Sequence, residues 1–297
     1  MKNRNRVKRF FKGLLVFNLI LIICFCGELI RSNYLISVNK YTVSDAAIKN
    51  PIRIVFFSDL HGREFGIGNY RLLDKIAAQK PDLICMVGDL FNEDADEAEI
   101  DRVCAMIESA TAIAPVYFSL GNHEFAYAQE NGDYLVQRVT STGAVVLDNE
   151  FLDLTIQGTE VRLGGYMGYY KNPHMMVSDK DQQHLESVFV WEFEHTDRYK
   201  ILLNHIVTQW VDWGAIDRNP VDLVLSGHYH GGVVRIPFCN QGLFAPYIGW
   251  FPPFTKGLFK GKTATCILTT GMAGSYGIPR FFNPAEICVV DLLPNNN

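Results

Sequence analysis

The chain has 297 residues, of which 48% are apolar and 20% charged, a composition typical of globular proteins and not of disordered or fibrous ones. Its net charge of −5 combines two unlike parts: residues 1–12 carry six basic side chains, and the other 285 residues hold 21 basic and 32 acidic ones, a balance of −11. Bulk nucleic acid binds basic surfaces, so we expect no such partner, and seven cysteines without a C-x-x-C pair argue against a zinc–thiolate site or a disulfide framework.

The N-terminal segment has the features of a membrane anchor. Residues 13–27 are uncharged and mostly apolar, and extension to residue 30, with Lys12 reaching the headgroups, approaches the roughly 20 residues of a full span. A cleaved signal peptide is the alternative, but no small-residue cleavage site follows the run. We predict a single pass of the cell membrane with the body outside the cytoplasm, because the basic residues precede the span. The predicted parts are a cytoplasmic tail over 1–12, a signal anchor over 13–30, and a connector with an edge strand over 31–50.

From residue 51 onward, apolar runs of β type alternate with segments of helical spacing. Strands are predicted over 52–57, 83–87 and 116–120, and helices over 69–79, 96–109 and 133–141. This alternation predicts a parallel sheet built from strand–helix–strand units. After about residue 145 the pattern changes to short strands, predicted over 151–156, 160–164, 199–203, 223–225, 233–236, 263–268 and 287–292. We therefore predict one α/β domain over 51–293, with two sheets between helical layers.

Five short polar motifs each follow a predicted strand, where the loops of an α/β sheet gather ligands. The motifs are Asp59-Leu60-His61, Gly88-Asp89, Gly121-Asn122-His123-Glu124, Asn204-His205 and Gly227-His228-Tyr229-His230-Gly231. Each is weak alone, but five of the eight histidines fall within them, which makes the set specific. The other three, His174, His184 and His195, lie in a polar stretch and are predicted to be surface residues.

The residue types in these motifs predict a site for two divalent metal ions. Imidazole, carboxylate and amide groups without thiolate select ions such as Mn²⁺, Fe²⁺, Zn²⁺ or Mg²⁺. Two ions about 3.5–4 Å apart stabilise the attacking and leaving oxygens of a displacement at phosphorus, and they supply a bridging hydroxide at neutral pH. Seven candidate ligands are too many for one ion, whereas one bridging carboxylate gives two ions four protein ligands each. The candidates are Asp59, His61, Asp89, Asn122, His205, His228 and His230.

The series of motifs resembles the calcineurin-like metallophosphoesterase superfamily over about residues 52 to 292. The resemblance implies a two-sheet αββα sandwich behind one transmembrane helix. Within the superfamily, residues 65–69, 80–84 and 280–284 resemble the membrane-anchored branch of phosphodiesterases and UDP-2,3-diacylglucosamine pyrophosphatase-like enzymes. The resemblance implies that Asp89 bridges the two metals and that His123 binds neither, protonating the leaving oxygen instead and oriented by Asp59. The implied metal ligands are Asp59, His61, Asp89 and His230 for the first ion, and Asp89, Asn122, His205 and His228 for the second.

Departures from the family pattern narrow the subclass. Asn92 stands where an acid usually follows the G-D motif, so a supporting carboxylate role is expected to be lost there. Purple acid phosphatases need a tyrosine at the same position, so we do not expect the chain to belong to that subclass. Residues 90–93 also lack the acid and arginine of the serine/threonine protein phosphatases.

Two further features leave alternatives open. The segment 243–259 is rich in aromatic residues, and it is either an apolar lip that meets acyl chains or the bilayer, or a proline-braced loop folded onto its own core. Arg280 either contacts a substrate phosphate or pairs with a surface acid, which is the more frequent case. The aromatic residues are Phe244, Tyr247, Trp250, Phe251, Phe254 and Phe259.

The combined pattern predicts a metal-dependent phosphodiesterase or pyrophosphatase that acts on a lipid-linked or envelope phosphate at the membrane. An exported phosphomonoesterase or nuclease would share the metal site and is the first alternative. A non-catalytic, membrane-tethered binding module is the second, and the complete set of candidate ligands argues against it. No obligate protein partner is inferred.

Overall fold

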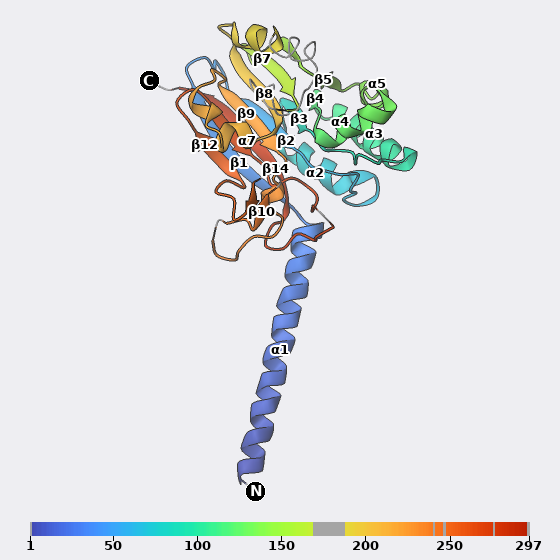
Figure 1. Cartoon of the computed structure of the whole chain (residues 1–297), viewed down its shortest axis with the longest axis vertical. Coiled ribbons are helices and arrows are strands. Elements are labelled where there is room, and N and C mark those ends of the chain that lie inside the picture. The colour runs from blue at the N-terminus through green and yellow to red at the C-terminus, as the bar shows by residue number, and fades with distance from the viewer. Residues whose placement is uncertain (1, 169–187, 240, 246–247, 276, 296–297) are drawn as a thin grey trace.

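In the computed structural model of the chain, a long N-terminal helix projects from an α/β body (Figure 1). The structure describes residues 2–168, 188–239, 241–245, 248–275 and 277–295. The helix, α1 (Lys2–Tyr34), is long and apolar enough over Arg6–Tyr34 to cross a membrane, and its most apolar stretch is not buried against the body. The helix continues to Tyr34, beyond the predicted end of the membrane span at residue 30, and the first strand begins at Ile36.

The first sheet has six strands in the order β1-β14-β2-β3-β4-β5. All neighbouring strands are parallel except β14 and β2, which are antiparallel. Strand β1 lies at the edge of this sheet, where an edge strand was predicted. The strands are β1 (Ile36–Asp45), β2 (Ile52–Phe57), β3 (Leu83–Val87), β4 (Val116–Ser119), β5 (Val145–Leu147) and β14 (Ala285–Pro294).

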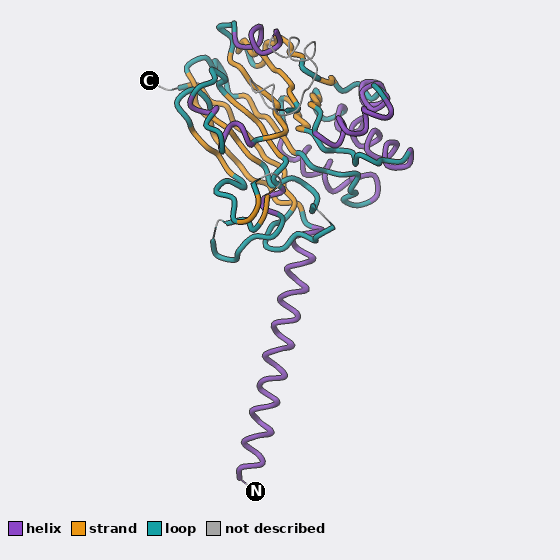
Figure 2. The backbone as a smooth tube through the Cα atoms, viewed as in Figure 1, coloured by secondary structure: helices purple, strands orange, loops and turns teal. Residues whose placement is uncertain are grey.

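The helices that follow these strands cover the outer face of the first sheet (Figure 2). The Asp96 side chain caps α3 by accepting from the Glu99 N–H at 2.7 Å, and Ile100, Val103 and Ile107 bury one face of that helix. Helix α4 was not predicted, because its first turn consists of the polar G-N-H-E motif. The helices are α2 (Tyr70–Gln79), α3 (Glu97–Thr111), α4 (Asn122–Asn131) and α5 (Tyr134–Thr140).

The second sheet also has six strands, in the order β12-β13-β9-β8-β7-β6. Its inner pairs are parallel and its two outer pairs are antiparallel. The strands are β6 (Glu150–Ile156), β7 (Thr159–Tyr166), β8 (Tyr199–Ile206), β9 (Leu223–Gly227), β12 (Gly257–Lys260) and β13 (Thr265–Leu268). The chain also forms the helix α7 (Thr208–Val211), the 3₁₀ turns η1 (Ile67–Asn69), η2 (Ala215–Asp217) and η3 (His230–Gly232), and a small hairpin of β10 (Phe244–Ala245) and β11 (Gly249–Trp250).

The strand predicted over 233–236 is wrong. Only isolated bridges form there, at Val234 and Arg235. Val233 adopts a φ of 56°, a left-handed conformation that interrupts an extended strand directly after η3.

The two sheets pack face to face, which confirms the predicted two-sheet sandwich. Side chains from both sheets fill the layer between them, for example Phe56 and Cys85 from the first and Leu203, Leu225 and Ile267 from the second. These residues alternate along their strands with others that face the helices, as the period of two requires. The parallel strands β2, β3, β4, β8 and β9 therefore bring their carboxyl ends to one edge of the sandwich.

Candidate metal centre

Every predicted ligand lies at the carboxyl end of a parallel strand. Asp59 and His61 follow β2, and Asp89 follows β3. Asn122 and His123 open α4 after β4, His205 is the penultimate residue of β8, and His228 and His230 follow β9. Since these strands lie side by side in two packed sheets, their ends bring the polar side chains together.

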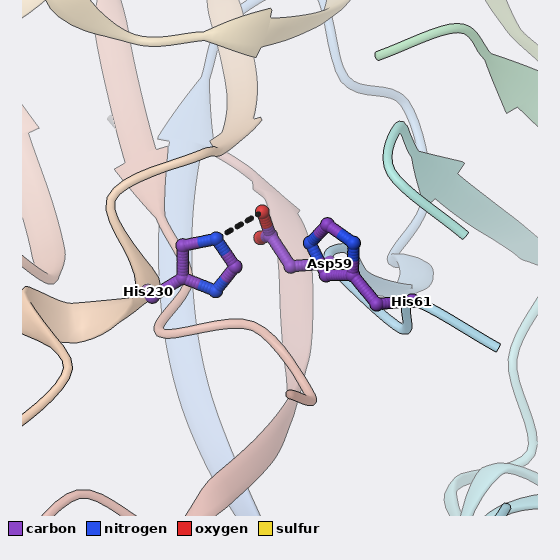
Figure 3. A group of neighbouring side chains, drawn as sticks. All are labelled: Asp59, His61 and His230. Atoms are coloured by element: carbon purple, nitrogen blue, oxygen red, sulfur yellow. Dashed lines mark ion pairs between the residues drawn. The ribbon is translucent and has the colours of Figure 1, made fainter. Parts of the chain in front are cut away.

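Three overlapping groups of ligand atoms form, each with all its atoms within 4.8 Å of one another. In the first, His230 Nε2 lies 3.6 Å from Asp59 Oδ1, with the His61 ring beside them (Figure 3). In another, His205 Nε2 lies 3.0 Å from Asp89 Oδ2. The groups are Asp59, His61 and His230; His61, Asp89 and His123; and Asp89, His205 and His228. Asp89 thus lies between two sets of histidines.

Five residues of the centre hold left-handed backbone conformations, which are uncommon for residues other than glycine. They are Asp59, His61, Asp89, His228 and His230, with φ between 46° and 75°. Backbone hydrogen bonds across the strand ends fix them: the Asp59 N–H donates to Gly88 O at 3.0 Å, and the His61 N–H donates to Asp89 O at 3.1 Å. Strained backbone of this kind concentrates at functional sites, where the surrounding structure enforces it.

Two motif glycines are required by close approach. A Cβ at Gly121 would lie 2.2 Å from Asp89 Oδ1, and a Cβ at Gly88 would lie 2.6 Å from His205 Nδ1. A side chain at either position would displace a candidate ligand. This packing explains why the acid and the amide of the motifs each follow a glycine.

Burial and mutual charge set the protonation of the centre. Burial lowers the pKa of His61 to about 4 and that of His228 to about 3, which keeps both imidazoles neutral, the form that binds metal. Burial also acts to lower the pKa of His205, but the Asp89 carboxylate outweighs it and raises that pKa to about 10. Burial raises the pKa of Asp89, yet the facing histidines outweigh it and hold this pKa well below its ordinary value.

The donor set fits divalent cations. His61 Nε2 and Asn122 Oδ1 are buried and make no hydrogen bond within the described part of the chain. Buried polar atoms without a partner are costly, so such atoms beside two buried carboxylates indicate that a ligand satisfies them. Imidazole nitrogen, amide oxygen and carboxylate oxygen are the ligands that borderline and hard divalent ions take.

Glu124 is a functional residue that the sequence reasoning missed. Its buried carboxylate accepts the N–H groups of Asp89, Leu90 and Gly121 at 2.7–2.8 Å and that of Phe91 at 3.0 Å. Burial and the nearby Asp89 raise the pKa of Glu124 to about 7. It therefore fixes the loop that carries Asp89, and its position three residues into α4, typical of a capping acid, was the available signal.

Asn92 stands where the family usually has an acid, and a carboxylate reaches this position from Glu99 of α3 instead. Glu99 of α3 accepts the Asn92 N–H at 2.7 Å and the Asn92 side-chain amide at 2.9 Å. The same amide donates to His61 O at 3.2 Å. Asn92 and Glu99 together thus hold the backbone of His61.

His123 lies at the rim of the centre with 28% of its side chain exposed. Its Nε2 is 3.9 Å from Asp89 Oδ2, and its Nδ1 is 3.9 Å from Glu93 Oε2. Among the described residues, the carboxylates within 4 Å of the ring are therefore those of Asp89 and Glu93, and not the predicted Asp59. The ring meets that of His61 edge to face, with the centroids 4.6 Å apart.

The structure gives Arg280 neither of the two roles considered from the sequence, which were contact with a substrate phosphate and pairing with a surface acid. The side chain is fully buried, and its guanidinium donates to three backbone carbonyls, those of Ala273, Asn283 and Pro284. Because the side chain is fully buried, it is not placed to contact a substrate phosphate in the pocket, and it forms no ion pair with a surface acid within the described residues. Of the histidines predicted to lie at the surface, His195 is exposed, whereas His174 and His184 lie outside the described residues.

A pocket of about 430 Å³ opens beside the centre. His61 and His123 form its inner wall, and Arg63 supplies a positive charge. Asn33, from the last turn of α1, also lines the pocket, and the Arg63 guanidinium donates to Asn33 O. The site is therefore built partly from the apolar N-terminal helix.

Comparisons with known proteins identify related sequences and structures. The family model for the calcineurin-like phosphoesterases matches residues 52–232. An uncharacterized metallophosphoesterase of Campylobacter jejuni is 26% identical over 266 residues, covering 86% of this chain and 63% of the relative, so the chain spans less than two thirds of that protein. Phosphodiesterase YaeI of Escherichia coli is 25% identical, over 82% of this chain and 83% of the relative. A dimetal phosphatase from Danio rerio gives a TM-score of 0.43 at 13% identity, over 74% of this chain and 88% of that one.

Proposed function

Because the chain belongs to the calcineurin-like phosphoesterase family, we propose that it is a metal-dependent phosphodiesterase or pyrophosphatase with two divalent ions. The observation that carries the proposal is the cluster of Asp and His side chains at converging strand ends, in which His61 Nε2 and Asn122 Oδ1 are buried without a hydrogen bond from the described residues. The complete cluster argues against a non-catalytic binding module.

The candidate ligands divide into two sets that share Asp89. The first comprises Asp59, His61, Asp89 and His230, and the second Asp89, Asn122, His205 and His228. Two bound divalent ions would supply charge stabilisation at phosphorus and a nucleophilic hydroxide at neutral pH. Mn²⁺, Fe²⁺, Zn²⁺ and Mg²⁺ all suit these donors.

Two residues at the pocket are assigned to the substrate. His123 reaches the pocket with a partly exposed ring, so it donates a proton to the leaving oxygen as the bond from phosphorus to that oxygen breaks. Arg63 binds a non-reacting phosphate oxygen, since its charge lines the same pocket. Water supplies the oxygen that replaces the leaving group.

The assay that tests the proposal uses the full chain, stripped of metal and reloaded with Mn²⁺. Hydrolysis of bis-p-nitrophenyl phosphate that depends on metal is the expected result, with weaker action on p-nitrophenyl phosphate. Preference for p-nitrophenyl phosphate would favour a phosphomonoesterase, and preference for single-stranded DNA would favour a nuclease. Reloading with Fe²⁺, Zn²⁺ or Mg²⁺ extends the assay, and lack of hydrolysis with each of these ions and with Mn²⁺ would overturn the proposal.

The substrate is proposed to be a lipid-linked or envelope phosphate, and the body is placed outside the cytoplasm. The apolar stretch of α1 and the basic residues that precede this stretch support the placement. Protease added to intact cells should digest the chain beyond residue 31 and leave residues 1–12 protected. A body that is digested only after the membrane is permeabilised would reverse the orientation.

A further inference from the structure

A second cavity, of about 370 Å³, lies next to the pocket at the metal centre. The side chains that line it are apolar, and two of them reach solvent: Trp250 is 72% exposed and Ile278 is 49% exposed. We call this cavity the apolar groove; its walls are Val233, Val234, Leu243, Phe244, Trp250 and Ile278. Large apolar side chains left open in a concave surface mark a binding site more often than a structural accident.

The apolar groove adjoins the pocket at the metal centre. Ile278 lines both cavities, and Val233 is three residues beyond the candidate ligand His230. Phe244 of β10 and Trp250 of β11 pair across the small hairpin, with their ring centroids 5.6 Å apart. A molecule with its phosphate at the metal centre can therefore place an apolar substituent in the groove.

The wall of the groove is held in strain next to the metal centre. Val233 has a φ of 56°, and a left-handed conformation is a genuine outlier for a β-branched residue. The Asn283 side-chain amide donates to Val233 O at 3.0 Å and to His230 O at 2.7 Å. One residue thus fixes both the groove wall and a candidate ligand, which indicates a shared functional constraint.

The groove lies at the end of the body from which α1 departs. In the view of Figure 1, the hairpin labelled β10 is at the same end of the body as the C-terminal end of α1. The loop that carries Asn283 docks on that helix: the Asn283 N–H donates to Ser32 Oγ at 3.1 Å, and the Phe281 ring lies 5.0 Å from that of Phe25. The loop at 280–283 thus joins the wall of the groove to the C-terminal end of α1.

The aromatic segment 243–259 has an exposed part and a part that packs against the core. Trp250 and Phe251 are exposed, whereas Phe254 and Phe259 pack against each other and against the core. Tyr247 lies outside the described residues. Of the exposed pair, Trp250 lines the groove and Phe251 follows it directly in sequence.

We propose that the apolar groove binds the hydrocarbon chain of an amphipathic phosphate ester whose phosphate lies at the metal centre. The inference rests on the proposed function, because it assigns the second part of the same substrate. Burial of a methylene group in the groove then contributes to transition-state binding, and each fully buried methylene raises kcat/KM by up to about fourfold.

The test is a series of alkyl p-nitrophenyl phosphodiesters, from ethyl to octyl, assayed below their micelle concentrations. The full chain is placed in phosphatidylcholine nanodiscs with Mn²⁺. Since the leaving group is the same throughout, chemistry is constant and only the chain differs. We expect the octyl ester to exceed the ethyl ester in kcat/KM by at least about tenfold, because several methylenes are buried.

Two tryptophan variants distinguish binding of the alkyl chain in the groove from partitioning of the ester into the nanodisc lipid. Trp250→Ala removes one groove wall and should reduce the octyl-to-ethyl ratio of kcat/KM by at least about threefold. Trp191→Ala removes a tryptophan that is 60% exposed and does not line the groove, so it should keep the wild-type ratio. Inhibition of the wild type by alkyl phosphates of rising length provides a measurement that needs no variant, and it should strengthen with length.

The outcomes distinguish the two proposals. If none of the esters is hydrolysed, the proposed function fails. If the ethyl ester is hydrolysed but neither hydrolysis nor inhibition depends on chain length, the groove does not hold a hydrocarbon chain. A chain-length preference that Trp250→Ala and Trp191→Ala leave equally intact also overturns the inference, because it assigns the effect to the bilayer.

Discussion

Gly121→Ala is expected to disable the metal centre while leaving the fold in place. The backbone of Gly121 is extended, with φ −108° and ψ −175°, so alanine meets no backbone strain there. The new Cβ would instead lie 2.2 Å from Asp89 Oδ1 and 2.4 Å from the Asp89 nitrogen, more than 1 Å short of ordinary contact at 3.4 Å. Asp89, the residue shared by both proposed metals, must therefore move by about that distance.

The size of the effect follows from this displacement. A shift of about 1 Å in a reacting group can cost about 10²-fold in rate, so we expect at least this loss in kcat/KM for bis-p-nitrophenyl phosphate. Overpacking costs about 1–3 kcal/mol, which lowers Tm by about 2–12 °C for a body of this size. The variant should thus remain folded at 25 °C with weakened metal binding.

The assay combines kcat/KM, metal content by mass spectrometry after dialysis, and thermal unfolding. Gly27→Ala is the matched control, because a Cβ at Gly27 has no heavy atom within 4 Å and the residue lies in α1. It should keep wild-type activity and metal content. A Gly121→Ala protein with both ions bound and activity within about threefold of wild type would refute the assignment of Asp89 as a fixed, shared ligand.

Three further changes probe the same site. Asp89→Asn should reduce bound metal well below two ions per chain and nearly abolish hydrolysis; two tightly bound ions with normal turnover would contradict a bridging role. His123→Ala should keep its metal and lose kcat by about 10²–10⁴, with a smaller loss for p-nitrophenolate than for alkoxide leaving groups; an emptied metal site or equal losses would exclude the proton donor. In metal-free protein, the pKa of His205, raised to about 10 by Asp89 against the effect of burial, gives stability that is complete below about pH 6.5 and is lost as the pH rises through 10. His205→Gln should flatten this decline in Tm, and an unchanged decline would assign it to other groups.

Local patterns were enough to predict most of the sheet. Strands β2 and β3 begin and end at the predicted residues, because uninterrupted apolar runs bounded by polar residues are typical of buried parallel strands. Helix α3 follows the same logic, since Asp96 caps its start and its apolar residues recur with helical spacing. The strand-end positions of the candidate ligands follow directly from these strands.

Features that depend on distant parts of the chain could not be predicted. The left-handed Val233 is held by Asn283, fifty residues away, so the apolar run at 233–236 looks like a strand in sequence. The carboxylate beside Asn92 comes from Glu99 on the next helix, and the buried partners of Arg280 are carbonyls, which carry no sequence signal. Glu124 was missed for a different reason. Its partners are backbone N–H groups, and because every residue except proline has one, the sequence does not indicate which of them the carboxylate binds.

The contact between α1 and the loop at 280–283 makes the N-terminal helix part of the site. Asn33 exchanges two hydrogen bonds with the backbone of Arg280, at 2.8 and 3.1 Å, and Ser32 holds Asn283. Asn283 in turn holds the carbonyl of His230. A chain of hydrogen bonds through Asn283 thus connects the last turn of α1 to the backbone of His230. A body cut after residue 34 would lose these bonds and the Asn33 wall of the pocket together, so its activity would not represent that of the full chain.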